Sequence, residues 1–150
     1  MTAAVLAALV TTTSGVVAGV LFAVALSVLP ALRVMPADRY VYAHKLLGRN
    51  WDPTMPVIVL ASTVLDIALA VIGPPGTTAL YVIGAALLLF VSIVSHWGNV
   101  PINRQVKSID PNSMPADWSD PRPLWQRFHT LRTTLAVAAA AVNAAALALR

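Results

Sequence analysis

The 150-residue chain is 58% hydrophobic and only 11% charged, with a mean hydropathy of +0.76, whereas soluble domains are about 45 to 50% apolar and about 25% charged. This composition predicts an integral membrane protein, and the net charge of +4 does not indicate nucleic-acid binding because the ten basic residues are scattered and form no basic stripe. The absence of cysteine excludes a disulfide framework, a thiolate nucleophile and a zinc–thiolate site.

The first predicted span covers residues 5–32, since no charged residue occurs between Ala3 and Leu32. This run exceeds the roughly 20 residues that cross a bilayer. It lacks a basic amino-terminal region, so we expect it to be retained and not cleaved as a signal peptide. Gly15 and Gly19 form a small-xxx-small step, which predicts a close contact with another helix.

The first long connection is predicted to contain a short helix of about three turns, which begins at Pro36 and ends near Gly48. Tyr40, His44 and Leu47 share one face of it, so this helix would lie on the membrane surface and turn His44 toward the bundle. The alternative is an exposed interfacial histidine. The following sequence Asn-Trp-Asp-Pro, residues 50–53, predicts an N-cap and a first-turn proline of the next helix.

Three further spans are predicted at residues 55–72, 78–98 and 126–149. The second span carries Asp66 inside the hydrocarbon, where an unpaired charge is expensive, so Asp66 should be neutral, paired or functional. The alanine-rich fourth span favours close packing within a bundle. The spans together predict one all-α domain, residues 1–150, folded as an integral membrane four-helix bundle with two long connections, the first containing the short interfacial helix.

The basic residues predict the orientation in the membrane. Seven of them lie in the two long connections, whereas the opposite side carries Arg150 and the amino terminus. By the positive-inside rule, both connections are cytoplasmic and both termini are outside, in what we expect to be the plasma membrane.

The main polar cluster begins where the third span ends, in the sequence SHWGNVPINR at residues 95–104. His96, Asn99 and Asn103 would share one face of a continuing helix. Pro101 instead predicts a kink or a helix end, because proline cannot donate the helical hydrogen bond.

A second polar stripe opens the fourth span, where Trp125, His129 and Arg132 follow an i, i+4, i+7 spacing. Two such stripes on two helices can face each other and form a site. The alternative is that both stripes are capping residues and interfacial anchors.

The motifs GNVPIN, residues 98–103, and WxxxHxxR, residues 125–132, resemble the signature of a family of small four-helix membrane proteins whose named members are anthrone oxygenases. The resemblance covers nearly the whole chain, including LGRNWDPTMP at residues 47–56. It implies a four-helix bundle that oxidises an anthrone to an anthraquinone with O2 and no recognised cofactor. His44 and His96 match no motif of this family.

Oxidation of an acidic C–H group without a cofactor needs a base to form the carbanion and hydrogen-bond donors to hold the enolate. His129 suits the base because its unperturbed pKa lies near neutrality. The expected oxyanion donors are Asn99, Asn103 and Arg132. The expected substrate contacts are Trp97, Trp125 and Asp66.

Two other interpretations stay open. In a metal variant, His44, His96 and His129 would bind copper, iron or zinc, although the sequence contains no HxxxH or HxxE pair, so the cofactor is either absent or a histidine-bound transition metal. In the second interpretation, the chain is a noncatalytic binding or assembly subunit. The expected partners are the lipid bilayer and a small apolar substrate, without nucleic acid, and self-association is left open.

Overall fold

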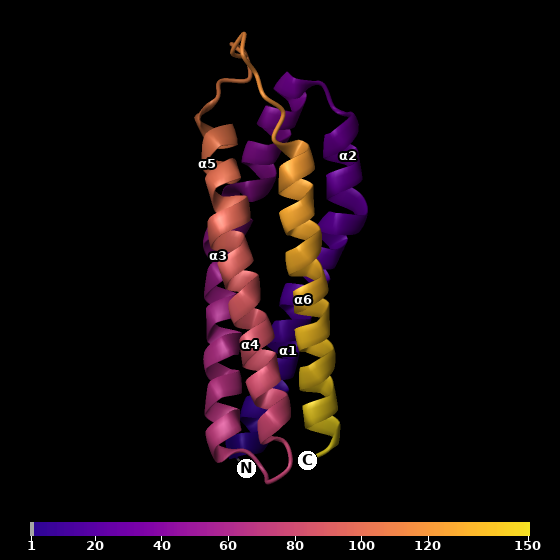
Figure 1. Cartoon of the computed structure of the whole chain (residues 1–150), viewed down its shortest axis with the longest axis vertical. Helices are drawn as coiled ribbons and strands as arrows, with labels where there is room; N and C mark the ends of the chain where they lie inside the picture. The colour runs from indigo at the N-terminus through magenta and orange to yellow at the C-terminus, as the bar shows by residue number, and fades with distance from the viewer. Residues whose placement is uncertain (1) are drawn as a thin grey trace.

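The computed structural model describes residues 2–150 as a bundle of four long helical rods, with no strand among these residues (Figure 1). Each rod is long and apolar enough to span a membrane: Thr2–Val34, Ala37–Ile72, Thr78–Ser108 and Arg122–Ala148. Both termini lie at one end of the bundle, and the long connection before α6 lies at the other (Figure 1). The predicted all-α four-helix fold is confirmed, and it is compatible with an integral membrane protein.

Two of the rods contain a π-helical turn followed by a proline. Rod 1 consists of α1 (Thr2–Ala23), η1 (Val24–Val28) and α2 (Leu29–Val34), and rod 3 of α4 (Thr78–Val94), η2 (Ser95–Asn99) and α5 (Val100–Ser108). Pro30 and Pro101 each lie two residues after the turn. A proline leaves the carbonyl four residues earlier without its donor, and the turn shifts the hydrogen bonding by one residue, so that the Leu29 N–H binds the Val24 carbonyl and the Val100 N–H binds that of Ser95. Rod 3 therefore continues past Pro101 to Ser108 instead of ending near Trp97.

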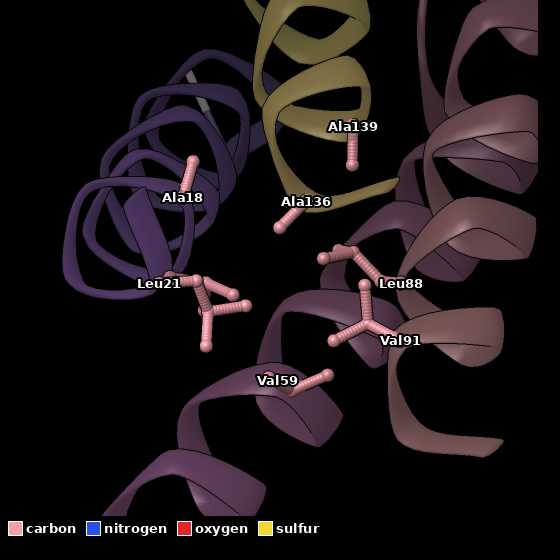
Figure 2. Close-up of a cluster of buried hydrophobic side chains, with 8 residues drawn as sticks. Ala18, Leu21, Val59, Leu88, Val91, Ala136 and Ala139 are labelled. Carbon is pink, nitrogen blue, oxygen red and sulfur yellow. The ribbon is translucent and has the colours of Figure 1, made fainter. Parts of the chain in front are cut away.

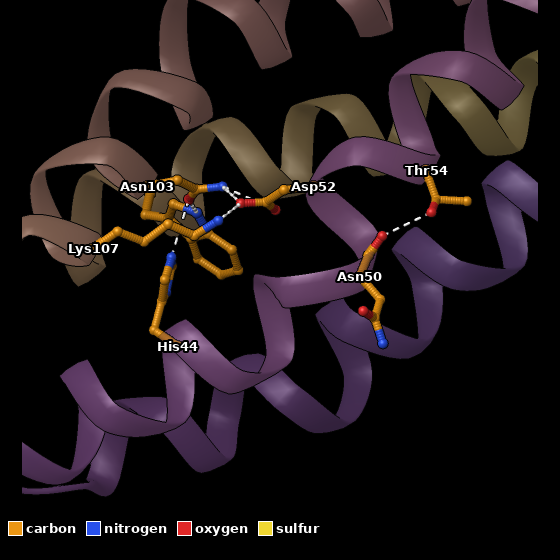
Figure 3. A network of polar contacts seen from close by, with 7 residues as sticks. His44, Asn50, Asp52, Thr54, Asn103 and Lys107 are labelled. Atoms are coloured by element: carbon orange, nitrogen blue, oxygen red, sulfur yellow. Dashed lines mark hydrogen bonds and ion pairs between the residues drawn. The ribbon is translucent and has the colours of Figure 1, made fainter.

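Rod 2 is one continuous helix, α3 (Ala37–Ile72), so the prediction of a separate short helix and a new start at residues 50–53 is wrong. Pro53 and Pro56 lie inside this helix. Thr54 Oγ1 donates a 2.7 Å hydrogen bond to the Asn50 carbonyl, which is the neighbour of the Arg49 carbonyl that Pro53 leaves without its helical donor (Figure 3). The first connection consequently shrinks to residues 35–36, and the long connection before α6 (Arg122–Ala148) runs over residues 109–121.

The interior is apolar in layers, and so is much of the exterior. The middle layer draws on all four rods and consists of Val17, Ala18, Leu21, Val59, Leu88, Val91, Ala136 and Ala139 (Figure 2). The two alanines let α6 approach its neighbours closely, as its composition predicts. On the outside of α3, Val57, Val64 and Val71 are exposed at a spacing of seven residues. Such an outward apolar stripe is what lipid covers in a membrane bundle.

The predicted close helix contact at Gly15 and Gly19 is not made within the chain. Both glycines are exposed, and nothing lies within 4 Å of where their Cβ atoms would be. The close approaches are at Gly84 and Gly98 instead. A Cβ on Gly98 would lie 2.5 Å from the Phe128 ring, and one on Gly84 would lie 2.7 Å from Asn143 Oδ1.

Arg122 ties the long connection to the end of α2. Its Nη1 donates to the carbonyls of Leu32 and Met35 at 3.0 and 2.6 Å, which would otherwise lack helical donors. Its Nη2 forms a 2.7 Å ion pair with Asp120, and the guanidinium lies 5.0 Å over the Tyr40 ring. The hydrogen bond from Arg122 holds the pKa of Asp120 below its usual value.

Replacing Arg122 with alanine should lower the free energy of unfolding by about 1–3 kcal/mol, the usual cost of losing hydrogen bonds from a charged donor. Denaturant unfolding in detergent measures this loss. Arg127→Ala, at an exposed position of the same helix, is the control and should change stability little. Because the pKa of Asp120 is lower in the folded chain, the stabilisation from its ion pair with Arg122 is present at neutral pH. This stabilisation is lost as the pH falls below about 4 and the carboxylate becomes protonated. Equal stabilities of the two variants would show that Arg122 does not hold this end together.

Candidate active site

A cavity of about 710 Å³ lies among the halves of the rods that face the long connection. This volume is typical of small-molecule sites. Rod 1 contributes an apolar wall, and rods 2, 3 and 4 contribute both apolar and polar side chains. The two π-helical turns line it with Val24, Val28, Ser95, His96, Trp97 and Asn99. Turns of this kind are frequent at functional sites, and here both border a cavity that is lined by all four rods.

Asn103 is the centre of the polar network beside the cavity (Figure 3). The Trp125 Nε1–H donates to Asn103 Oδ1 at 2.9 Å, and because an indole nitrogen only donates, the atom that it meets must be the amide oxygen. His44 Nε2 lies 3.1 Å from the same oxygen and therefore also donates. The amide nitrogen faces both carboxylate oxygens of Asp52 at 3.4 Å.

His44 lines the cavity with one ring nitrogen committed and the other free of partners in the described chain. Since Nε2 carries the hydrogen that Asn103 accepts, Nδ1 of the neutral ring has an available lone pair. The ring is held edge-on by Tyr40 at 5.4 Å and by Trp125 at 5.6 Å between centroids. His44 is thus a fixed imidazole that can accept a proton. The sequence prediction that turned it toward the bundle agrees with its buried position.

Asp52 and Lys107 form an ion pair at the rim of the network, with Lys107 Nζ 2.6 Å from Asp52 Oδ2. Both side chains are about one-third exposed, at 32% and 37%. Such a pair contributes little stability, and its effect is to orient the Asn103 amide. Neither residue is a predicted site residue. The sequence predicts Asp52 only as part of a helix start at residues 50–53.

His129 is fully buried, and both of its ring nitrogens have partners. Arg132 Nε and Nη2 lie 3.2 and 2.9 Å from Nδ1, so Nδ1 accepts. Nε2 lies 3.0 Å from the Leu21 carbonyl oxygen, so Nε2 carries the hydrogen. The ring also stacks on Trp125 at 5.0 Å and is not among the residues that line the cavity. This geometry disagrees with the predicted role as a base, because the ring has no free lone pair.

Arg132 reaches the cavity wall and brings a positive charge to it. Besides its bonds to His129, its Nη1 lies 3.4 Å from Ser95 Oγ. Among residues 2–150, no carboxylate forms an ion pair with it. These contacts use three of its five N–H groups. The guanidinium therefore keeps two N–H groups and a charge without an ion-pair partner for a ligand.

The other predicted site residues separate into three groups. Asn99 lines the cavity and donates its amide to the Trp125 carbonyl at 3.2 Å, while its Oδ1 has no partner. Trp97 and Trp125 both line the cavity, although Trp97 is 73% exposed and Trp125 is buried. Asp66 lies outside the cavity, deeper in the bundle, so the prediction that it contacts the substrate is not supported by its position.

The predicted histidine ligand set is not assembled. In the part of the chain that the structure describes, no three His, Asp or Glu side chains are close enough to hold a metal ion. His44 and His96 both line the cavity, but both nitrogens of His129 are engaged elsewhere. Spacing along the sequence could not show that the third ring turns toward Leu21.

A family model described as anthrone oxygenase matches residues 44–142. The chain belongs to the anthrone oxygenase family. The match begins at His44 and includes every polar residue that lines the cavity, whereas the apolar wall from rod 1 lies outside it. No curated protein and no solved structure shows significant similarity to the chain. The resemblance seen in GNVPIN and WxxxHxxR is therefore confirmed at the level of the family.

Proposed function

We propose that this anthrone oxygenase family member is a membrane oxygenase that uses O2 to convert an activated methylene of an apolar aromatic or phenolic substrate into a ketone. The observation that carries the proposal is that one largely apolar cavity is lined both by His44, which has a free imidazole nitrogen, and by Arg132, whose guanidinium has no ion-pair partner among the described residues. An anthrone matches these groups, because it has an acidic methylene between two rings and a carbonyl oxygen on the opposite side.

The first step is removal of a methylene proton by His44 Nδ1. The electron pair delocalises onto the carbonyl oxygen, and the N–H groups of Arg132 stabilise this oxyanion. Asn103 holds the hydrogen of His44 on Nε2 through the 3.1 Å contact, which directs the lone pair of Nδ1 to the substrate. The apolar remainder of the cavity keeps water from the carbanion.

The second step is reaction of the carbanion with O2. One electron passes to O2, and the carbon radical and superoxide combine to a peroxide, which takes the proton from His44 and becomes a hydroperoxide. Removal of the remaining C–H proton then breaks the O–O bond and forms the ketone. The hydroxide that leaves takes up a proton, so one oxygen atom of O2 ends in the product and the other in water.

In this scheme His129 is a positioning residue. Its Nε2–H is fixed on the Leu21 carbonyl of rod 1, and its Nδ1 accepts two N–H groups of Arg132. The ring thus holds the guanidinium at the cavity wall without touching the substrate.

The test is oxidation of anthrone by the purified protein in detergent. We expect anthraquinone to form well above the rate of autoxidation in protein-free detergent, with one O2 consumed per product and with label from ¹⁸O2 in the new carbonyl. Metal analysis of the same preparation shows whether activity follows a bound metal. A rate equal to the protein-free control for anthrone and for phenolic anthrones would contradict the proposal.

We also propose that both termini are outside and that the long connection is cytoplasmic, in the plasma membrane. The basic residues support this orientation, since they gather at the end of the bundle opposite the termini. A carboxyl-terminal alkaline phosphatase fusion should be active and a carboxyl-terminal green fluorescent protein fusion, exported in unfolded form, should be dark. The reverse pattern would contradict the orientation.

A further inference from the structure

A second polar cluster lies below the middle apolar layer, at a level where all four rods meet. We call it the lower cluster, and it consists of Ser14 from α1, Asp66 from α3, Gly84 from α4 and Asn143 from α6. Ser14, Asp66 and Asn143 are 0% exposed. The middle layer of Figure 2, whose members include Val59 and Ala139, lies between this cluster and the cavity. The lower cluster is therefore separate from the proposed active site.

Asp66 has no cationic partner. Among residues 2–150, no Lys, Arg or His side chain forms an ion pair with it. Its side-chain hydrogen-bond partner is the neutral amide of Asn143, whose Nδ2 donates to Asp66 Oδ2 at 3.3 Å. An ionised carboxylate in the interior of a membrane bundle, with one long hydrogen bond, is very unfavourable.

The hydrogen bonds of the lower cluster also show that a donor is missing. Asp66 Oδ1 and Asn143 Oδ1 are both buried and accept no hydrogen bond. The Ser14 hydroxyl is 2.7 Å from the Val10 carbonyl, and the Asn143 amide serves Asp66 and Ser14. The nearby Tyr81 hydroxyl is also buried without a partner, and it forms no hydrogen bond with either oxygen. Buried polar atoms are nearly always satisfied, so the cluster requires one more hydrogen.

Gly84 leaves room for one oxygen of Asp66 and one oxygen of Asn143. A Cβ on Gly84 would lie 2.7 Å from Asn143 Oδ1 and 2.9 Å from Asp66 Oδ2. Both oxygens therefore pack over the bare Cα of this glycine. A carboxylate oxygen and an amide oxygen in one dry notch favour a hydrogen on the carboxyl group over an ionised carboxylate.

We propose that Asp66 is a proton-binding site, which holds a proton at neutral pH and shares it with Asn143. The bound proton removes the buried charge and supplies the missing donor. It is enclosed by all four rods, so it exchanges with solvent when the bundle opens. A proton fits this site better than a metal cation, because an amide N–H of Asn143 already points at the carboxylate.

Infrared spectroscopy of the full-length protein in detergent tests this assignment. At pH 7 we expect a carbonyl-stretching band of a protonated carboxylic acid, which shifts when aspartate carries ¹³C at its carboxyl group. The band should be lost in Asp66→Asn and kept in Asp52→Asn, whose carboxylate is partly exposed and paired with Lys107. In H2O-to-D2O exchange, the Asp66 band should shift far more slowly than the amide bands of the exposed long connection.

Three results would overturn the proposal. The first is that the wild type has no carboxylic acid band at pH 7, and the second is that the band persists in Asp66→Asn. The third is that the band disappears when sodium ions are added, which would make the site a cation site. If Asp66→Asn does not fold, the ¹³C shift of the wild-type band and its sodium dependence still decide. Failure of the anthrone assay leaves the infrared result untouched, because Asp66 lies outside the cavity.

Discussion

Replacing Arg132 with methionine should lower kcat for anthrone oxidation by about 10² to 10³, the usual cost of removing an oxyanion donor. The physical reason is that this guanidinium reaches the cavity wall with no carboxylate partner among the described residues, so its charge is available to a developing enolate. Single-turnover measurement of quinone formation separates this loss from weaker substrate binding.

The matched control is Arg127→Met on the same helix, where the side chain is exposed and does not line the cavity. It should keep the wild-type rate. Arg132→Lys should fall between the two, because it retains a charge but cannot donate to His129 and the substrate in a fixed fork. If Arg132→Met is as fast as Arg127→Met, Arg132 does not stabilise the oxyanion.

Replacing His44 with glutamine should lower kcat by about 10² to 10⁴, because the free Nδ1 is the proposed base and glutamine does not accept a proton. The fall in rate at low pH, which reports protonation of this base, should then disappear from the pH profile. The folded bundle should persist, since a glutamine amide can still donate to Asn103. The measurement is initial-rate kinetics over pH with circular dichroism as the folding check.

Two further histidine variants separate the candidate bases. His96 lines the same cavity but has no proposed catalytic role, so His96→Gln should change the rate only a few-fold. His129→Gln can still accept from Arg132 and donate to Leu21, so a positioning role predicts that most activity survives. If His129→Gln loses activity and His44→Gln keeps it, the base is His129, as its position in the WxxxHxxR motif first indicated.

The sequence predicts the architecture well because its strongest signal is the alternation of long apolar runs with polar connections. Four spans, their antiparallel order and the termini at one end all follow from that pattern. The prediction that the polar stripes of the third and fourth spans face each other is supported by the hydrogen bond between Trp125 and Asn103. Helix faces can be derived from spacing alone once the helix itself is correctly placed.

Proline does not mark a helix end in the second rod of this chain. Pro53 and Pro56 lie inside α3, whose continuity places His44 and Asp52 eight residues apart on one face. Assigning a break between them hid the contact of both residues with Asn103. In membrane bundles, hydroxyl side chains and local π adjustments satisfy the freed carbonyls, so proline alone is a weak signal of a boundary.

The roles of individual atoms were beyond any spacing argument. The Leu21 carbonyl that engages His129 is 108 residues away in the chain. No pattern within WxxxHxxR could indicate that it fixes the hydrogen on Nε2. The same holds for Gly84, whose importance depends on Asp66 and Asn143 arriving from two other helices.

The π-helical turns let a rod hold one extra residue without changing the register of the site. The i→i+5 bonding of a π turn takes up one residue more than an α turn does, so the helix beyond the turn keeps its orientation. Deleting one residue from Ser95–Asn99 should therefore restore regular helix geometry and leave Asn103 and Lys107 facing His44 and Asp52. Deleting one residue from the middle of α4 (Thr78–Val94) would instead rotate the rod beyond it by about 100° and move both side chains away from their partners. In homologous chains, a gap at η2 should leave these four residues unchanged, whereas a gap within α4 should be accompanied by changes in them.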